Sequence, residues 1–377
     1  MSFSILQPGR ILFGRGVVAQ APALIRSLGA RVLVVHGASG RHIDVLSQGL
    51  ADLDAESQWL PCAGEPTLVM LEDAIYNTRG FAPDVVLGIG GGAVLDMAKA
   101  LAALIPSPTP ALDHLEVVGH GLPLSAPPLP FIAIPTTAGT GAEVTKNAVI
   151  GARGQKVSLR DDRMIARVAI VDPALTDGCP WPVTLASGLD AVTQVIEPYL
   201  SIKATPYTDA LSEPAIAPGF AALLRLHRAE DPIARDTLAW TSLCGGLALA
   251  NGGLGAVHGF SGVIGGRTGA AHGAICGALL GPVLAMNRRL TNGAARARAD
   301  HVCNLLAGVL GCASESAPQA IADWAHGAGL PGLADLGLAP QDLPEVALAS
   351  GDASSMKGNP VKPGIPDLIV ALTAAMR

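Results

Sequence analysis

The sequence predicts an α/β protein with two domains, the first built on a parallel doubly wound sheet and the second all-helical. A chain of 377 residues is long for a single core, so two domains are the natural expectation. In the first half, short apolar runs alternate with helical patterns, which is typical of a doubly wound sheet. In the second half, long Ala/Leu-rich segments contain almost no β-branched runs, which favours helices.

The elements follow from these patterns in chain order. Four apolar runs, each ending at glycine or proline, have the length of buried strands: 31–37, 84–90, 129–135 and 167–173. Helical patterns between them include 41–53 and 93–104. A cluster of turn residues at 176–182 predicts the boundary between domains 1–178 and 179–377. Beyond it the expected helices are 184–200, 207–226, 233–252, 273–287, 293–310 and 316–328.

Composition narrows the class of protein. Half of the residues are hydrophobic, 15% are charged and the net charge is −6, so nothing predicts a nucleic-acid or anionic-membrane partner. The six cysteines contain no CxxC pair, which predicts reduced thiols in a cytoplasmic protein. Pro8 and Arg10 interrupt the only apolar patch near the N-terminus, so no signal peptide is expected. No apolar run reaches the length of about eighteen residues that a membrane span needs.

Three consecutive glycines, Gly90, Gly91 and Gly92, separate the strand 84–90 from the following helix. Glycine lets the backbone approach a ligand closely, and a helix N-terminus presents free amides to phosphate. Gly88, Gly90 and Ala93 also satisfy G-x-G-x-x-A, the dinucleotide pattern. The match falls at a later strand than usual, and a tight strand–helix turn is the simpler alternative.

A second turn, "IPTTAGTGAEVT", follows the strand 129–135 and includes Thr136, Thr137 and Thr140. Threonine hydroxyls and glycine amides together suit diphosphate and ribose contacts. Taken with the glycine turn, this segment predicts a phosphate- or dinucleotide-binding site.

Several motifs in this order resemble the iron-containing alcohol dehydrogenase family: "GGGAVLDMAK", "IPTTAGTGAEVT", "VAIVDPALT", "ASGLDAVTQVIEPYLS", "GLGAVHG" and "AAHGA". The resemblance covers roughly residues 5–290 and extends to glycerol dehydrogenases, maleylacetate reductases and, more distantly, dehydroquinate synthase. It implies a nucleotide-binding α/β domain, a helical domain of the dehydroquinate synthase-like architecture, and an active site in the cleft between them. We expect a homodimer that acts on a small alcohol or carbonyl compound.

The stretch "SGLDAVTQVIEPYL" carries Asp190, Gln194 and Glu197 at i, i+4 and i+7, a stripe of the kind that is usually solvated. Metal-binding members of the family offer an Asp, a His four residues later and two further His. Asp190, His258 and His272 match that set, and Gln194 stands at the remaining His position. The resemblance therefore implies Fe or Zn held by Asp190, His258 and His272 as catalytic residues, with Gln194 as a weak fourth ligand or a hydrogen-bonding neighbour, because an amide oxygen is a poorer ligand than imidazole.

A second departure is Gly262, where many metal-dependent members carry another His, so a proton relay through that imidazole is lost. Three alternatives remain open. In a metal-free reductase resembling maleylacetate reductase, His258, His272 and Gln194 hold an anionic substrate. A lyase resembling dehydroquinate synthase needs several basic residues, and Arg267 is the only one between the two histidines. A non-catalytic binding protein does not explain three aligned ligands.

The resemblance implies a nicotinamide cofactor, and the turn after the first strand bears on which one. NAD-preferring members often place an Asp where this chain has Gly37, whereas Ser39 and Arg41 suit the 2′-phosphate of NADP. NADP is therefore favoured over NAD, although Ser39 also suits a helix cap. The full set of expected cofactor-binding residues is Ser39, Gly90, Gly91, Gly92, Ala93, Asp96, Thr136, Thr137, Thr140 and Lys156. An exposed surface lysine is the alternative for Lys156, and the tail motif "SSMKGNP" (354–360) has no assigned role.

Overall fold

The computed structural model describes residues 2–377, without the side chain of Val45. The chain forms two compact units. One unit consists of Leu6–Thr137 and Ala142–Asp177, and we call it the sheet unit. The other consists of Gly178–Arg377 with Ala138–Gly141 and the residues up to Ile5, and we call it the helical unit.

The sheet unit is built on a six-stranded sheet with the order β1-β8-β5-β4-β2-β3. All five neighbouring pairs are parallel. The strands are β1 (Arg10–Phe13), β2 (Arg31–Gly37), β3 (Glu56–Cys62), β4 (Val85–Gly90), β5 (Phe131–Pro135) and β8 (Val168–Val171). The chain runs outward from β2 to β3 and then returns to β4, after which it continues to β5 on the other side. The strand order therefore reverses between β2 and β4, which is the topological switch point.

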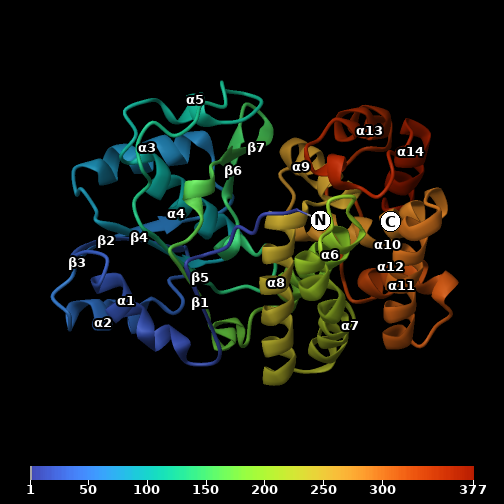
Figure 1. Cartoon of the computed structure of the whole chain (residues 1–377), viewed down its shortest axis with the longest axis horizontal. Helices are drawn as coiled ribbons and strands as arrows, with labels where there is room; N and C mark the ends of the chain where they lie inside the picture. The colour runs from blue at the N-terminus through green and yellow to red at the C-terminus, as the bar shows by residue number, and fades with distance from the viewer. Residues whose placement is uncertain (1) are drawn as a thin grey trace. The chain divides into compact units, whose positions relative to one another are not determined.

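Helices cover both faces of this sheet (Figure 1). Val32 and Val34 of β2 face a core with α1 (Ala21–Arg26) and α2 (Ile43–Ala51). The alternating residues Leu33 and Val35 face the opposite core, with α3 (Leu68–Arg79) and α4 (Gly92–Leu104). This alternation is what a strand buried on both faces requires. The predicted doubly wound α/β fold is confirmed.

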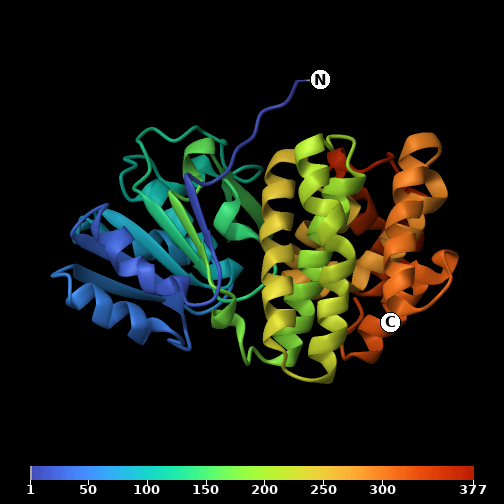
Figure 2. The same cartoon turned by 60° about the horizontal axis from the view of Figure 1, so that its bottom comes forward.

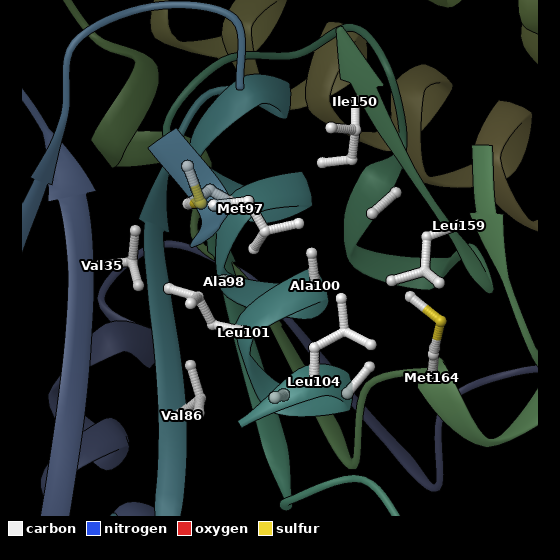
Figure 3. Packing of buried hydrophobic residues seen from close by; sticks show 14 of the residues in the cluster. Val35, Val86, Met97, Ala98, Ala100, Leu101, Leu104, Ile150, Leu159 and Met164 are labelled. Carbon is white, nitrogen blue, oxygen red and sulfur yellow. The ribbon is translucent and has the colours of Figure 1, made fainter. Parts of the chain in front are cut away.

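The helix α4 is buried on almost every side. Figure 3 shows its side chains between those of β2 and β4 and those of an antiparallel hairpin, β6 (Asn147–Ala152) and β7 (Gln155–Arg160). A helix that is apolar all round is expected to lie inside a protein. The short elements of this unit are η1 (Val17–Gln20), α5 (Ala111–His114), η2 (Ala142–Val144), η3 (Asp162–Met164) and η4 (Pro173–Thr176).

The helical unit contains nine α-helices within its described residues: α6 (Trp181–Leu200), α7 (Pro206–Arg228), α8 (Pro232–Gly252), α9 (Ala256–Thr268), α10 (His272–Leu290), α11 (Gly293–Leu310), α12 (Ala317–Gly327), α13 (Leu343–Gly351) and α14 (Ile365–Ala374). Three 3-10 turns complete it: η5 (Ser314–Ser316), η6 (Pro340–Asp342) and η7 (Ser355–Gly358). The helices α6, α7 and α8 run side by side (Figure 2). A separate apolar core joins α9, α10, α13 and α14.

Of the helices between residues 2 and 377, none alone is long and apolar enough to cross a membrane. Only α8 and α9 taken together pass that test, and they are bent by 98° at their junction.

Candidate metal centre and cofactor-binding edge

The polar stripe of α6 is buried rather than solvated. The exposed fractions of Asp190, Gln194 and Glu197 are 1%, 2% and 4%. The helix packs against α7, α8 and α10, so this stripe lies in the interior of the helical unit. Buried carboxylates are costly unless charged or hydrogen-bonding groups accompany them.

Two imidazoles and a thiol surround Asp190. Its Oδ1 lies 3.4 Å from Nε2 of His258 on α9 and 3.7 Å from Nε2 of His272, the first residue of α10. The Sγ of Cys276, one turn further along α10, lies 3.9 Å and 3.6 Å from the same two nitrogens. The structure thus brings Asp190, His258 and His272 together and adds Cys276, with the four donor atoms within 4.8 Å of one another.

Gln194 lies beside this cluster and acts on its carboxylate. The Gln194 amide Nε2 donates to Asp190 Oδ2 at 3.0 Å, which leaves Oδ1 facing the two histidines. Gly245 of α8 packs so closely against Gln194 that a Cβ there would lie 2.9 Å from Cβ of Gln194.

Glu197 orients His258. Its Oε2 accepts a hydrogen bond from Nδ1 of His258 at 2.7 Å, and its Oε1 accepts from the backbone N–H of Val257 at 2.6 Å. Because a carboxylate can only accept, it keeps the imidazole proton on Nδ1 and leaves a lone pair on Nε2. This carboxylate–histidine pairing is the usual support of a metal-binding imidazole. The sequence offered a signal for it, since Glu197 continues the stripe of Asp190.

The tail motif 354–360 fixes the start of the helix that carries His258. Asn359 Oδ1 accepts from the backbone N–H of Ala256, and its side chain exchanges two hydrogen bonds with that of Asn287. Gly358 packs so closely on Leu254 that a Cβ there would lie 2.1 Å from the Leu254 carbonyl oxygen. The motif is therefore structural support for the cluster.

The four cluster residues shift one another's pKa. Burial by itself would lower the pKa of both histidines, but the Cys276 thiol and the Asp190 carboxylate raise the pKa of His258 well above its usual range and that of His272 to about 9. Conversely, burial would raise the pKa of Asp190 and Cys276, but the two imidazoles lower both. Each acid here is stabilised in its charged form by the neighbouring bases.

This donor set fits a divalent metal ion. Asp190 Oδ1 and Gln194 Oε1 are buried without a hydrogen-bond partner among the described residues, and buried oxygens of this kind usually have one. A carboxylate, two imidazoles and a thiol are all ligands of zinc. A cation within the cluster would satisfy the orphaned carboxylate oxygen.

The sheet unit places the glycine turn at the switch point. The carboxyl ends of β2, β4 and β5 lie next to one another, at Gly37, Gly90 and Pro135. Gly91 is the N-cap of α4 in extended conformation, and no side chain of the described residues caps the helix there. A Cβ on Gly90 would lie 2.6 Å from Val94, so this glycine is required by packing, as the tight-turn alternative holds. The α4 N-terminus is nevertheless a suitable anion site at the edge where such folds bind ligands.

The threonine turn divides between the two units. Thr136 donates its backbone N–H to the Gly90 carbonyl at 2.9 Å, and the Thr137 hydroxyl would lie 3.4 Å from a Cβ on Gly91, so both belong to the glycine turn. Thr140 lies within Ala138–Gly141, which packs in the helical unit. The structure therefore groups two of the three predicted threonines with the glycines.

The remaining predicted cofactor residues occupy different surroundings. Ala93 lies in the first turn of α4, and Asp96 of the same helix accepts from the backbone N–H of Val149 at 3.1 Å. Lys156 is not the exposed lysine of the alternative interpretation, because its side chain is only 10% exposed and lies 3.6 Å from Glu65 Oε1.

The turn after β2 carries Ser39 and Arg41, and both are exposed. The Ser39 hydroxyl accepts from the backbone N–H of Arg41 at 3.4 Å, and the Arg41 guanidinium donates to the Asp177 carbonyl. A Cβ on Gly37 would meet no atom within 4 Å.

Two further positions considered in the sequence, Gly262 and Arg267, lie in the helical unit. A Cβ on Gly262 would meet no atom within 4 Å, so the missing imidazole leaves space one turn after His258. Arg267 is occupied by ion pairs with Glu345 at 2.7 Å and Asp342 at 4.0 Å.

A doubly wound sheet with a glycine turn at its switch point suits a bound nucleotide, and a buried carboxylate–imidazole cluster suits a metal ion; some oxidoreductases combine the two in one chain. The chain belongs to the iron-containing alcohol dehydrogenase family. The family model "Iron-containing alcohol dehydrogenase" matches residues 8–173, and "Fe-containing alcohol dehydrogenase family, C-terminal" matches residues 184–376.

Curated relatives agree with this placement. The chain is 35% identical to the probable alcohol dehydrogenase EutG of Escherichia coli over 76% of this chain and 73% of the relative. It is 31% identical to the lactaldehyde reductase of the same organism over 95% of both chains. The solved structure of a 1,3-propanediol oxidoreductase superposes with a TM-score of 0.88 at 26% identity and full coverage of both chains. The protein is thus an enzyme of the alcohol dehydrogenase type, which interconverts alcohols and aldehydes.

Proposed function

We propose that the protein is an NAD(P)-dependent oxidoreductase that interconverts an alcohol and an aldehyde or ketone, with a divalent metal, Fe or Zn, held by Asp190, His258 and His272. The observation that carries this proposal is the buried Oδ1 of Asp190, which faces Nε2 of both histidines and has no hydrogen-bond partner among the described residues. Three protein ligands are the usual number at a catalytic zinc.

Some residues of this site would hold the metal, and others orient those ligands. When bound, a divalent metal supplies Lewis-acid polarisation of the alcohol or carbonyl oxygen. Asp190 provides one oxygen, because Gln194 holds the other by a hydrogen bond. Glu197 keeps the proton of His258 on Nδ1, so that Nε2 is free to bind.

The nicotinamide nucleotide is assigned to the other set of residues. The backbone amides of Gly90, Gly91, Gly92 and Ala93 at the start of α4 suit its diphosphate. Further contacts are assigned to Asp96, Thr136, Thr137, Thr140 and Lys156. A nicotinamide bound there would supply hydride transfer to or from the substrate carbon. Gly262 provides no imidazole for a proton relay.

NADP(H) is favoured over NAD(H) in this proposal. Ser39 and Arg41 are exposed in the turn after β2, where a hydroxyl and a guanidinium suit a 2′-phosphate. Gly37 offers no carboxylate that would repel this phosphate or bind the ribose hydroxyls.

The rival function is a metal-free reductase of an anionic substrate. The grouping of His258, His272 and the Gln194 amide around Asp190 bears on it, because imidazole and amide groups can hold an anionic substrate by hydrogen bonds without a metal. A screen of aldehydes and keto acids with NADPH and NADH, before and after removal of metal by a chelator, separates the two. The proposal expects activity that is lost on chelation and restored by Zn²⁺ or Fe²⁺. Activity with keto acids that is indifferent to chelator would establish the rival instead.

A further inference from the structure

We propose that Cys276 is the fourth protein ligand of the metal centre and replaces the imidazole that is missing at Gln194. This inference rests on the proposed function in that it places a metal at Asp190, His258 and His272. It adds a ligand that no motif of the sequence indicated, and it specifies zinc, which can expand from four to five ligands and so could still accept a substrate oxygen.

The distances among the four donor atoms match a small tetrahedral ion. Zinc binds oxygen, nitrogen and sulfur at about 2.0–2.3 Å, so two donors of a tetrahedral site lie about 3.3–3.8 Å apart. Asp190 Oδ1 lies 3.4 Å and 3.7 Å from the two imidazole nitrogens. Cys276 Sγ lies 3.9 Å and 3.6 Å from the same nitrogens. For the atom types concerned, two of these four distances match the tetrahedral spacing and the other two exceed it by about 0.2–0.3 Å.

The chain delivers the thiol to this point by helical geometry. Cys276 follows His272 by four residues on α10, so its side chain lies on the same face, one turn further along. Its exposed fraction is 0%, and its sulfur lies within hydrogen-bonding distance of Nε2 of both His258 and His272. The sulfur thus already occupies the fourth corner of the cluster.

Gln194 is a weaker candidate for the same corner. Its amide Nε2 is used on Asp190 Oδ2, and its oxygen is neutral. A thiolate brings a negative charge, which stabilises a divalent metal ion more than a neutral amide oxygen does. Thiolate and imidazole donors also favour zinc over metals that prefer oxygen ligands.

Cobalt substitution tests this ligand directly, because a thiolate bound to Co²⁺ gives an intense sulfur-to-metal charge-transfer band that oxygen and nitrogen ligands do not give. We expect the native chain, stripped of metal and titrated with Co²⁺, to bind one ion and to show this band. Cys276→Ser and Cys276→Ala should lose the band and bind Zn²⁺ at least about a hundredfold more weakly. A hundredfold is the largest loss of metal affinity usually seen when a residue that only supports a ligand is replaced. Cys303→Ser is the matched control, since Cys303 is an equally buried cysteine on α11 outside the cluster, and it should keep both properties.

A second substitution that supplies a new ligand separates a metal-binding cysteine from a cysteine that only packs in the core. Adding Gln194→His to Cys276→Ser should restore tight Zn²⁺ binding without restoring the charge-transfer band. One Co²⁺ per native chain without the band would overturn the role of Cys276 and leave the proposed metal-dependent function intact. A native chain that is active but binds no Co²⁺ or Zn²⁺ would overturn both.

Discussion

Replacing Glu197 by Gln should weaken metal binding although Glu197 touches no metal. Its two oxygens accept at 2.7 Å from His258 Nδ1 and at 2.6 Å from the Val257 N–H, and the side chain is only 4% exposed. An amide has only one acceptor oxygen, so its NH₂ group must face either the Val257 N–H or His258 Nδ1. In the first case two donors oppose each other, and in the second the His258 proton must move to Nε2. Either result costs about ten- to a hundredfold in metal affinity, or roughly 1.4–2.7 kcal/mol.

The assay is competition for Zn²⁺ between the protein and a chromophoric chelator. Glu213→Gln is the matched control, because Glu213 also pairs with a histidine, His301, at 3.0 Å, but both side chains are at least 40% exposed. We expect the control to bind Zn²⁺ like the native chain. Unchanged Zn²⁺ affinity in Glu197→Gln would refute the assignment of Glu197 as the group that orients His258.

Three other predictions concern the cofactor, the pH dependence and the packing of the helical unit. Gly37→Asp should reverse a preference for NADPH over NADH of roughly ten- to a hundredfold, since one charged contact to the 2′-phosphate contributes about 1.5–3 kcal/mol; equal affinities of the native enzyme in fluorescence titrations would contradict this. Burial raises the pKa of Glu143 from 4.5 to about 7, so the stability it contributes is complete below pH 4.5 and is lost as the pH rises through 7. Relative to the native protein, Glu143→Gln should therefore gain up to roughly 3 kcal/mol in free energy of unfolding between these pH values, and parallel urea-unfolding curves across that range would argue against it. Gly262→Ala should stabilise α9 by up to about 1 kcal/mol, because its Cβ would meet open space. Gly245→Ala should destabilise the protein, because its Cβ would lie 2.9 Å from the Gln194 side chain. Thermal melts in which Gly245→Ala is the more stable of the two variants would contradict this packing.

The sequence predicted the strands that are buried on both faces. The run 31–37 coincides with β2, and 84–90 and 129–135 contain β4 and β5, because continuous apolar runs of this length are distinctive. The edge strand β3 (Glu56–Cys62) was missed, since it is polar, half-buried and contains Pro61. The hairpin of β6 and β7 was missed as well.

The helix α9 shows a second limit of sequence reasoning. Four of its 13 residues are glycine, and this composition argues against a helix. It forms because tertiary packing overrides propensity: Phe260 and Ile264 are fully buried, and Gly259 allows Met356 to pack against the helix axis. The predicted helices accordingly omitted the segment that carries His258.

The candidate site was partly readable from the sequence. Asp190, His258 and His272 were found through the family motifs, and the structure brings them together. Cys276 was interpreted as one of six scattered thiols, although its spacing of four from His272 on a helix was a usable signal. The support from Asn359 had no sequence signal, because a contact across 103 residues cannot be read from local pattern.

The most direct test of the central claim compares His272→Ala with the native protein, both purified without chelator. The metal content and the kcat/KM of each protein are measured. We expect metal in the native chain and, in the variant, weaker metal binding together with loss of activity, because His272 Nε2 lies beside both Asp190 Oδ1 and Cys276 Sγ in the cluster. A native chain that is fully active without metal, with a variant that keeps its kcat and only raises KM, would contradict it. His272 would then be a substrate contact and Asp190 an orienting carboxylate.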